Sequence, residues 1–334
     1  MKVQELRQLL SASNRELVEK AFVESYKQLR KGQKEEIDPV LIDILEGKAS
    51  EKKKIKSALS FEKLEQQVAV FIENAYAQNY IAPNRMIPKS QRSKWRFLVM
   101  NFIKELEKIP PESENYLKAV KLLTDLYTLM CEACNCYLFS TDDPFRSIGW
   151  EQSKLFELLV KKTFTAGYSR ENISQLLLYA ATGGLSRESL HIEQEMALLG
   201  GLRTSDVKLI AIEEAQKLVE ERLEKLKGLG KYDNRSYYLE DAVNELCGMI
   251  LLISIALAEP EKGVKYYFKH SQRHDKEITL YCALDLIQWM EEDDLWIKVY
   301  EDGIQGGIKP RESLKCKYEK RKSEVSEKLK PKVH

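Results

Sequence analysis

Five basic residues crowd one short stretch of the chain, and their types and spacing suit the binding of an anion. They are Arg85, Lys89, Arg92, Lys94 and Arg96. The apolar spacing that follows predicts a helix over residues 90–108, so these cations surround its start. A helix N-terminus carries a partial positive charge, which makes each added cation unfavourable by about 0.3–1 kcal/mol unless a negative group lies close. A compensating negative charge is therefore expected.

Two sources of negative charge would satisfy this cluster. Asp142 and Asp143 follow a long predicted helix and could fold back to pair with the arginines. Exposed charge runs are usually solvated or paired within the chain, which favours this internal pairing. Alternatively, a phosphate group or a nucleic-acid backbone binds there, because helix N-termini and guanidinium groups suit phosphate oxygens. The candidate anion-binding residues are Arg85, Lys89, Arg92 and Arg96.

Two further basic regions support binding of a polyanion. Residues 48–56 contain five lysines and one glutamate, and residues 309–334 contain ten Lys or Arg and four Glu. If these regions and the first cluster converge on one face, the chain would bind nucleic acid, and its affinity would fall steeply with salt. A sparse apolar stripe that includes Leu314 and Tyr318 instead favours docking of the C-terminal segment on the body of the protein.

Cysteine and histidine pairs supply a second candidate chemistry, the binding of a metal ion. Cys131 and Cys134 have CxxC spacing, and His270 and His274 stand four residues apart. No second cysteine or histidine cluster lies near the cysteines to complete four ligands, and the histidines have no obvious third ligand. The cysteines lie in an apolar helical pattern, where a thiol packs as a small hydrophobe, and the histidines lie in a polar junction. We therefore predict neither a metal nor a cofactor and keep both pairs as secondary candidates.

No catalytic motif is present in the sequence. The glycine pairs at 183–184, 200–201 and 306–307 match neither a P-loop nor a dinucleotide fingerprint, and we interpret them as helix stops. Whether the chain is an enzyme is left undecided, although the lack of a signature favours a non-enzymatic protein.

Composition and periodicity predict an all-α fold. The 334 residues contain only 15 Gly and 9 Pro, and 53 basic residues nearly balance 52 acidic ones. Apolar residues recur at spacings of three and four along nearly the whole chain, as in helices with one buried face. The predicted N-caps include Ser13, Ser169, Ser186 and Thr204. Helices joined by short loops lie antiparallel to their neighbours. We expect stacked antiparallel helix pairs, arranged as an irregular α-solenoid or as two helical bundles.

Breaks in this pattern predict four segments. They are an N-terminal helical segment (1–47), a helical subdomain (48–145), a helical-repeat-like domain (146–308) and a basic C-terminal helix or tail (309–334). The most apolar stretch, residues 246–258, is shorter than the roughly 20 residues that span a bilayer. It is predicted to be a buried helix, without membrane association. The N-terminus lacks the apolar core of a signal peptide, which predicts a cytoplasmic protein.

Three stretches of the first half resemble helical bacterial proteins that are classed as a domain of unknown function. They are LRQLLSASNRELVEKAFVESYKQL, RSKWRFLVMNFIKELEKIPP and TDDPFRSIGWEQSKLFELLVKK. The later segment LWIKVYEDGIQ is similar in style to tetratricopeptide-like and HEAT-like helix pairs. The resemblance implies a bacterial protein with an all-helical fold, and it implies no activity.

The leading functional hypothesis is a non-enzymatic scaffold that binds a protein or peptide, because helix pairs abound and no catalytic signature accompanies them. Aromatic residues would anchor such a partner if they are exposed. The candidates are Tyr237, Tyr238, Tyr266, Tyr267, Trp289 and Trp296. The alternative is a nucleic-acid- or phosphate-binding protein that uses the basic cluster from Arg85 to Arg96.

Overall fold

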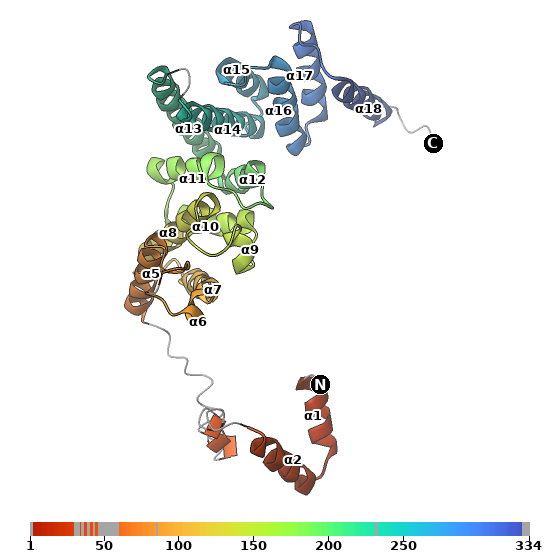
Figure 1. The fold of residues 1–334 in the computed structure, drawn as a ribbon. Helices are drawn as coiled ribbons and strands as arrows, with labels where there is room; N and C mark the ends of the chain where they lie inside the picture. The colour runs from red at the N-terminus through yellow and green to blue at the C-terminus, as the bar shows by residue number, and fades with distance from the viewer. Residues whose placement is uncertain are drawn as a thin grey trace. The chain divides into compact units, whose positions relative to one another are not determined.

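A computed structural model describes residues 3–29, 60–84, 86–230 and 233–328, together with seven positions at 34, 37, 38, 41, 42, 44 and 45. Within this part of the chain every regular element is a helix (Figure 1), and the predicted all-α fold is confirmed. The contacts divide the chain into two compact units, Met1–Leu64 and Glu65–His334.

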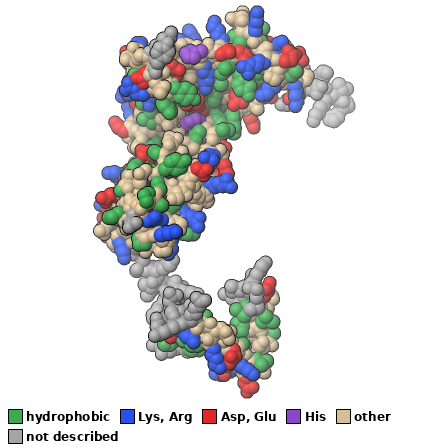
Figure 2. All heavy atoms as spheres, viewed as in Figure 1, with side chains coloured by type: hydrophobic (Ala, Val, Ile, Leu, Met, Phe, Trp, Pro, Cys, Tyr) green, Lys and Arg blue, Asp and Glu red, His purple; other side chains and the backbone are tan. Residues whose placement is uncertain are grey.

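The first unit contains α1 (Val3–Ala12) and α2 (Arg15–Lys27). The N-cap of α2 is Asn14, whose side chain accepts a hydrogen bond from the Leu17 backbone N–H at 2.9 Å. The predicted cap at Ser13 is wrong, because that hydroxyl donates to the Leu9 carbonyl instead. Figure 2 shows hydrophobic side chains on the surface of α1, and Leu9 is 58% exposed. The lysine-rich segment at 48–56 lies outside the described residues.

The second unit begins within α5 (Phe61–Tyr76) and continues through α6 (Lys89–Arg92), α7 (Trp95–Glu107) and α8 (Tyr116–Asn135). The single helix predicted over 90–108 is wrong, since residues 93 and 94 separate two helices. Trp95 opens the second of them and is buried, with its ring stacked on Phe139 at a centroid distance of 4.0 Å. Burial of this large ring fixes the start of α7 against the core.

A short helix that the sequence did not predict follows α8. Asp143 caps α9 (Pro144–Ile148) by accepting a hydrogen bond from the Arg146 N–H, and Gly149 ends it with a left-handed φ of 67°. Asp at the N-cap, Pro at the first helical position and Gly at the end are the residue types that favour such boundaries.

The remaining helices follow with short connections. They are α10 (Gln152–Ala166), α11 (Arg170–Thr182), α12 (His191–Gly201), α13 (Ser205–Lys227), α14 (Arg235–Ala256), α15 (Pro260–His270), α16 (Lys276–Trp289), α17 (Asp293–Gln305) and α18 (Glu312–Lys328). Ser169 and Thr204 cap α11 and α13 as predicted. The predicted cap at Ser186 is wrong, because α12 begins only at His191. The 200–201 glycine pair ends α12, as predicted.

The core of the second unit is built from helices that contact their neighbours along the chain. The central helix is α14, which packs against α11, α12, α13, α15 and α16. It contains most of the apolar stretch at 246–258, and its side chains from Leu246 to Ile255 are buried. Among the described helices none combines the length and apolar character needed to span a bilayer. Whether the helices form a solenoid stays a prediction.

Candidate anion-binding site

The predicted basic cluster forms one wall of a cavity of about 330 Å³ in the second unit. Lys89 is the first residue of α6, Arg92 is its last, and Arg96 is the second residue of α7. All three line this cavity despite the break between the two helices. The fourth predicted residue, Arg85, lies outside the described residues. We call this cavity the α6–α7 pocket.

Buried aromatic residues fix the inner side of the α6–α7 pocket. Trp95 and Tyr80 line it, and each ring packs against Phe139. Burial raises the pKa of Tyr80 to about 12, so its hydroxyl is neutral near pH 7. These rings tie the loop after α5, the start of α7 and the segment after α8 into one rigid surface.

Hydroxyl groups form the remaining polar surface of the pocket. They belong to Ser93, Ser140, Thr141 and Ser147. The hydroxyls of Thr141 and Ser147 lie 2.9 Å apart, and each is also within hydrogen-bond distance of the Asp143 backbone carbonyl. This bonding fixes the turn that presents them. The cavity therefore combines three cations with several hydroxyl groups, and its lining contains no Asp or Glu.

The charges of this pocket have no carboxylate partner within the described part of the chain. No ion pair found there involves Lys89, Arg92 or Arg96. Arg92 donates instead to two backbone carbonyls, those of Asn84 and of Ile87, the latter at 2.9 Å. The Arg96 guanidinium lies 4.9 Å from the centre of the Phe97 ring. These contacts hold Arg92 and Arg96 in place without neutralising them.

The internal pairing proposed for Asp142 and Asp143 is wrong, because both carboxylates bind elsewhere. Asp142 forms an ion pair with Arg187 at 2.8 Å. Asp143 is 4% exposed, and besides capping α9 it accepts hydrogen bonds from the Ser186 hydroxyl and the Arg187 N–H. Neither acid is therefore free to compensate the basic cluster.

The basic C-terminal helix, α18, differs because its cations have partners. Arg321 pairs with Asp293 at 2.7 Å, and Lys322 pairs with Glu301 at 2.8 Å. The stripe predicted to dock this helix does so: Leu314 is 2% exposed and the Tyr318 ring stacks on Tyr300. These two cations therefore attach α18 to α17.

The candidate metal ligands lie in separate surroundings. Burial raises the pKa of Cys131 and of Cys134 to about 12, which keeps both thiols protonated near pH 7. His270 ends α15 with its ring stacked on Tyr266, and burial lowers its pKa. His274 lies beyond the helix, with a side chain that is 92% exposed. Within the described ranges, no three or more His, Cys, Asp or Glu side chains are grouped to hold a metal ion.

The hydroxyl side of the pocket was missed in the sequence. Ser140, Thr141 and Ser147 follow Arg96 by more than 40 positions, and nothing in their spacing points to a basic cluster. The only available signal was the polar loop between two long apolar patterns, which places these residues at a helix end.

Comparison with protein-family models, with curated proteins and with solved structures finds no match to this chain. The resemblance of the first half to bacterial helical proteins and of the later segment to helical repeats stays a prediction. Function is therefore inferred from the geometry of the pocket itself.

Proposed function

We propose that this protein binds a phosphate group in the α6–α7 pocket. The observation that carries this proposal is the meeting of Lys89, Arg92 and Arg96 in one cavity whose lining contains hydroxyl groups and no acid. Charge-assisted hydrogen bonds from guanidinium and ammonium groups to phosphate oxygens are among the stronger polar interactions in proteins. A bound phosphate supplies the negative charge that this part of the chain lacks.

Backbone groups around the pocket also favour a phosphate ligand. Arg92 is held by two carbonyl groups, which positions its guanidinium before any ligand binds. Helix α7 runs for 13 residues from the pocket, without an acidic residue in its first turn or a side-chain cap at Lys94. The partial positive charge of its N-terminus therefore adds to that of the side chains.

A single phosphate group fits these observations better than an extended nucleic-acid backbone. Polyanion binding requires a wide array of free cations, whereas Arg321 and Lys322 on α18 pair with carboxylates. The pocket also has the volume of a small-ligand site, at about 330 Å³. A phosphate ion or the phosphoryl group of a small molecule is the ligand class we assign.

Isothermal titration calorimetry with inorganic phosphate tests this proposal directly. We expect saturable binding, and we expect Arg96→Gln and Lys89→Gln each to weaken it by about tenfold, since each removes one charge-assisted hydrogen bond. Lys320→Gln on α18 is the matched control, because Lys320 is 79% exposed and far along the chain. An unchanged affinity in both pocket variants would disprove the assignment.

Nucleic acid is the alternative outcome of the same test. A duplex or single strand that binds through many phosphates should show a steep dependence of affinity on salt. If Lys320→Gln weakens binding of DNA or RNA as much as Arg96→Gln does, the relevant ligand is a polyanion rather than one phosphate group.

A protein partner is the second candidate function, and two exposed rings favour it. Tyr237 and Tyr238 are 68% and 74% exposed near the start of α14, with their rings edge to face at 5.7 Å. Exposed tyrosines are frequent anchors of protein interfaces. Two other candidate anchors, Tyr267 and Trp296, do not meet the condition of exposure because they are buried.

Proximity crosslinking from position 238 in cell extract tests the protein-partner candidate. We expect one or a few reproducible crosslinked proteins, and we expect Tyr237→Ala to reduce their yield. The same crosslinker at the exposed Lys320 is the control. Equal products from both positions would contradict a specific interface at the paired tyrosines.

A further inference from the structure

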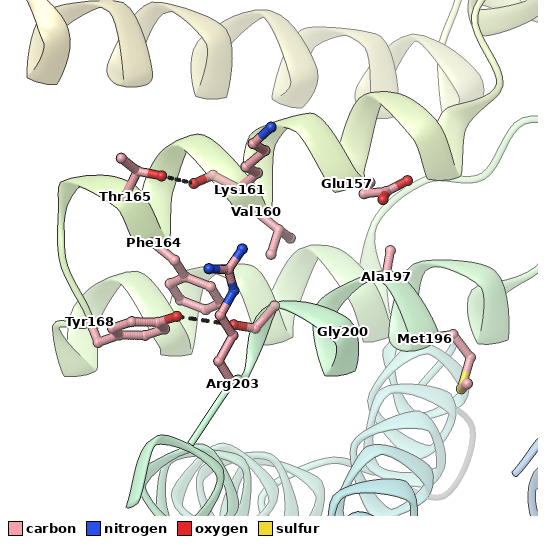
Figure 3. A pocket seen from close by; sticks show the side chains of 11 residues that line it. Glu157, Val160, Lys161, Phe164, Thr165, Tyr168, Met196, Ala197, Gly200 and Arg203 are labelled. Atoms are coloured by element: carbon pink, nitrogen blue, oxygen red, sulfur yellow. Dashed lines mark hydrogen bonds between the residues drawn. The ribbon is translucent and has the colours of Figure 1, made fainter. Parts of the chain in front are cut away.

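A second cavity, of about 380 Å³, lies between α10 and α12 and is separate in its residues from the α6–α7 pocket (Figure 3). Its lining combines aromatic, cationic and glycine residues: Lys161, Phe164, Tyr168, Gly200 and Arg203. This volume is within the range of small-ligand sites in proteins. We call it the α10–α12 cavity.

An aromatic surface forms one side of the α10–α12 cavity. Phe164 and Tyr168 stack with their ring centroids 4.6 Å apart. Phe164 is buried, whereas Tyr168 is 39% exposed, so the accessible part of this stack belongs to the tyrosine. The chain turns at Gly167, whose φ of 142° favours glycine. The hydroxyl of the next residue, Tyr168, donates a hydrogen bond to the Gly201 carbonyl at 3.2 Å. The ring is thereby fixed at the cavity.

Two cations accompany this ring. Lys161 and Arg203 line the cavity, and neither takes part in an ion pair among the residues that the structure describes. The one acid in the lining, Glu157, pairs with Lys154 at 3.0 Å. In Figure 3 the Arg203 side chain reaches from the segment after α12 toward Phe164. The polar part of the cavity is therefore positive.

The two adjacent glycines of α12 differ in what they allow. A Cβ atom at Gly201 would come within 2.4 Å of a methyl group of Val160, so close packing against α10 requires glycine there. A Cβ atom at Gly200 would meet no atom within 4 Å. Glycine is less stable than alanine inside a helix, and no packing contact requires it at position 200. The absence of a side chain at position 200 leaves this part of the cavity open.

We propose that the α10–α12 cavity binds a small aromatic anion. A planar ring would lie against Tyr168, since aromatic stacking favours ligands with a π face. A carboxylate or phosphate attached to that ring would bind Arg203 through charge-assisted hydrogen bonds. This inference is independent of phosphate binding in the α6–α7 pocket, because the two cavities share no lining residue.

Calorimetric titration of the full chain with adenosine monophosphate, which joins a planar base to a phosphate, tests the inference. We expect adenosine alone and inorganic phosphate alone each to bind this site about tenfold more weakly, because each lacks one of the two interactions. Arg203→Gln should weaken binding of the monophosphate and leave binding of adenosine unchanged. Tyr168→Leu should weaken both.

Gly200→Leu is the variant that separates the cavity from the rest of the surface. A Cβ atom at position 200 would meet no atom within 4 Å, so a leucine side chain starts in open space there. We expect this variant to abolish binding of adenosine monophosphate in the α10–α12 cavity, while an unchanged circular dichroism spectrum verifies the fold. Full affinity in both Gly200→Leu and Arg203→Gln would overturn the inference. So would a loss of adenosine monophosphate binding in Arg96→Gln but not in Arg203→Gln, because the ligand would then occupy the α6–α7 pocket.

Discussion

The α6–α7 pocket and the α17–α18 helix pair are two basic regions that look alike in sequence and differ in structure. In the pocket, Lys89, Arg92 and Arg96 face hydroxyl groups and backbone carbonyls. On α18, by contrast, Arg321 and Lys322 face the carboxylates of Asp293 and Glu301. A count of cations therefore does not measure the charge available to a ligand. That charge depends on which groups the fold places beside each cation.

The two regions also differ in how their cations are held. Arg321 is 19% exposed, and its guanidinium lies 4.9 Å from the Trp296 ring centre, so it contributes to attachment of the last helix. Arg96 is exposed, and its ring contact is with the adjacent Phe97. We expect the first kind of cation to affect stability and the second to affect binding. The predictions that follow test this division.

The largest effect is expected for charge reversal inside the pocket. Arg96→Glu should weaken inorganic phosphate binding by about a hundredfold, because it removes a charge-assisted hydrogen bond and adds repulsion. The same reversal at Lys320 on α18 should change the affinity by less than about twofold, since screening removes most of an exposed, distant charge. Calorimetry at 0.15 M salt measures both. Equal losses of phosphate affinity in the two variants would contradict the distinction between the two regions.

The second prediction concerns stability. Arg321→Ala should lower the free energy of unfolding by about 2 kcal/mol, because a hydrogen bond to a charged partner and a ring contact are both lost. Urea unfolding followed by circular dichroism measures the change. Lys320→Ala, one position earlier and 79% exposed, should cost less than about 0.5 kcal/mol. A cost for Arg321→Ala no larger than that of the control would contradict its structural role.

The third prediction extends the comparison to acidic residues. Glu245 pairs with Arg273 at 3.3 Å, whereas both carboxyl oxygens of Glu195 are buried with no hydrogen-bond partner. Burial, together with the nearby Glu245, raises the pKa of Glu195 well above its ordinary value. In the unfolded chain this carboxyl would ionise near pH 4.5. The folded protein therefore keeps the Glu195 carboxyl protonated. Its contribution to the free energy of unfolding is highest at low pH, where the unfolded chain is protonated too, and it falls as the pH rises toward the pKa of Glu195 in the folded protein.

Glu195→Gln should remove this pH dependence. We expect the variant to exceed the wild type in unfolding free energy by about 1 kcal/mol at pH 8. The difference should shrink toward pH 4.5, where the unfolded carboxyl is also protonated. Glu245→Gln is the control and should destabilise, because Arg273 loses its carboxylate partner. Parallel stability curves for wild type and Glu195→Gln from pH 5 to pH 8 would contradict the prediction.

The smallest effect is expected from simple removal of a pocket cation. Arg96→Ala should raise the free energy of unfolding by about 0.3–0.5 kcal/mol at low salt, because a like charge near the α7 N-terminus is relieved. The gain should disappear in 0.5 M sodium chloride, where the Debye length is only about 4 Å. Thermal unfolding at both salt concentrations measures it. A loss of stability at low salt would indicate that Arg96 already has a compensating partner.

Periodicity was sufficient to predict most helices, because each buries a continuous apolar face. Cap residues placed the starts of α11 and α13 correctly. The prediction failed at residues 93–94, where burial of Trp95 outweighs helix continuity. It also failed at Ser186, whose hydroxyl donates a hydrogen bond to the carboxylate of Asp143, 43 positions away in the sequence. Both failures come from tertiary contacts that local patterns do not encode.

The candidate site was predictable only in part, for the same reason. The local spacing of Lys89, Arg92 and Arg96 gave the cationic wall of the pocket. The hydroxyl wall comes from residues 140–147, and the α10–α12 cavity from helices separated by a whole helical element. The pairing of α18 with acids on α17 could not be deduced from charge counts, because it depends on which surfaces dock.

Asp143 connects the turn that lines the α6–α7 pocket to a segment outside the pocket. One carboxylate oxygen caps α9, which presents Ser147 to the pocket, while the other accepts from Ser186 in the segment before α12. One wall of the α6–α7 pocket is thus tied to a segment that does not line it. Displacement of Ser186, which is 6% exposed, would release one end of this link.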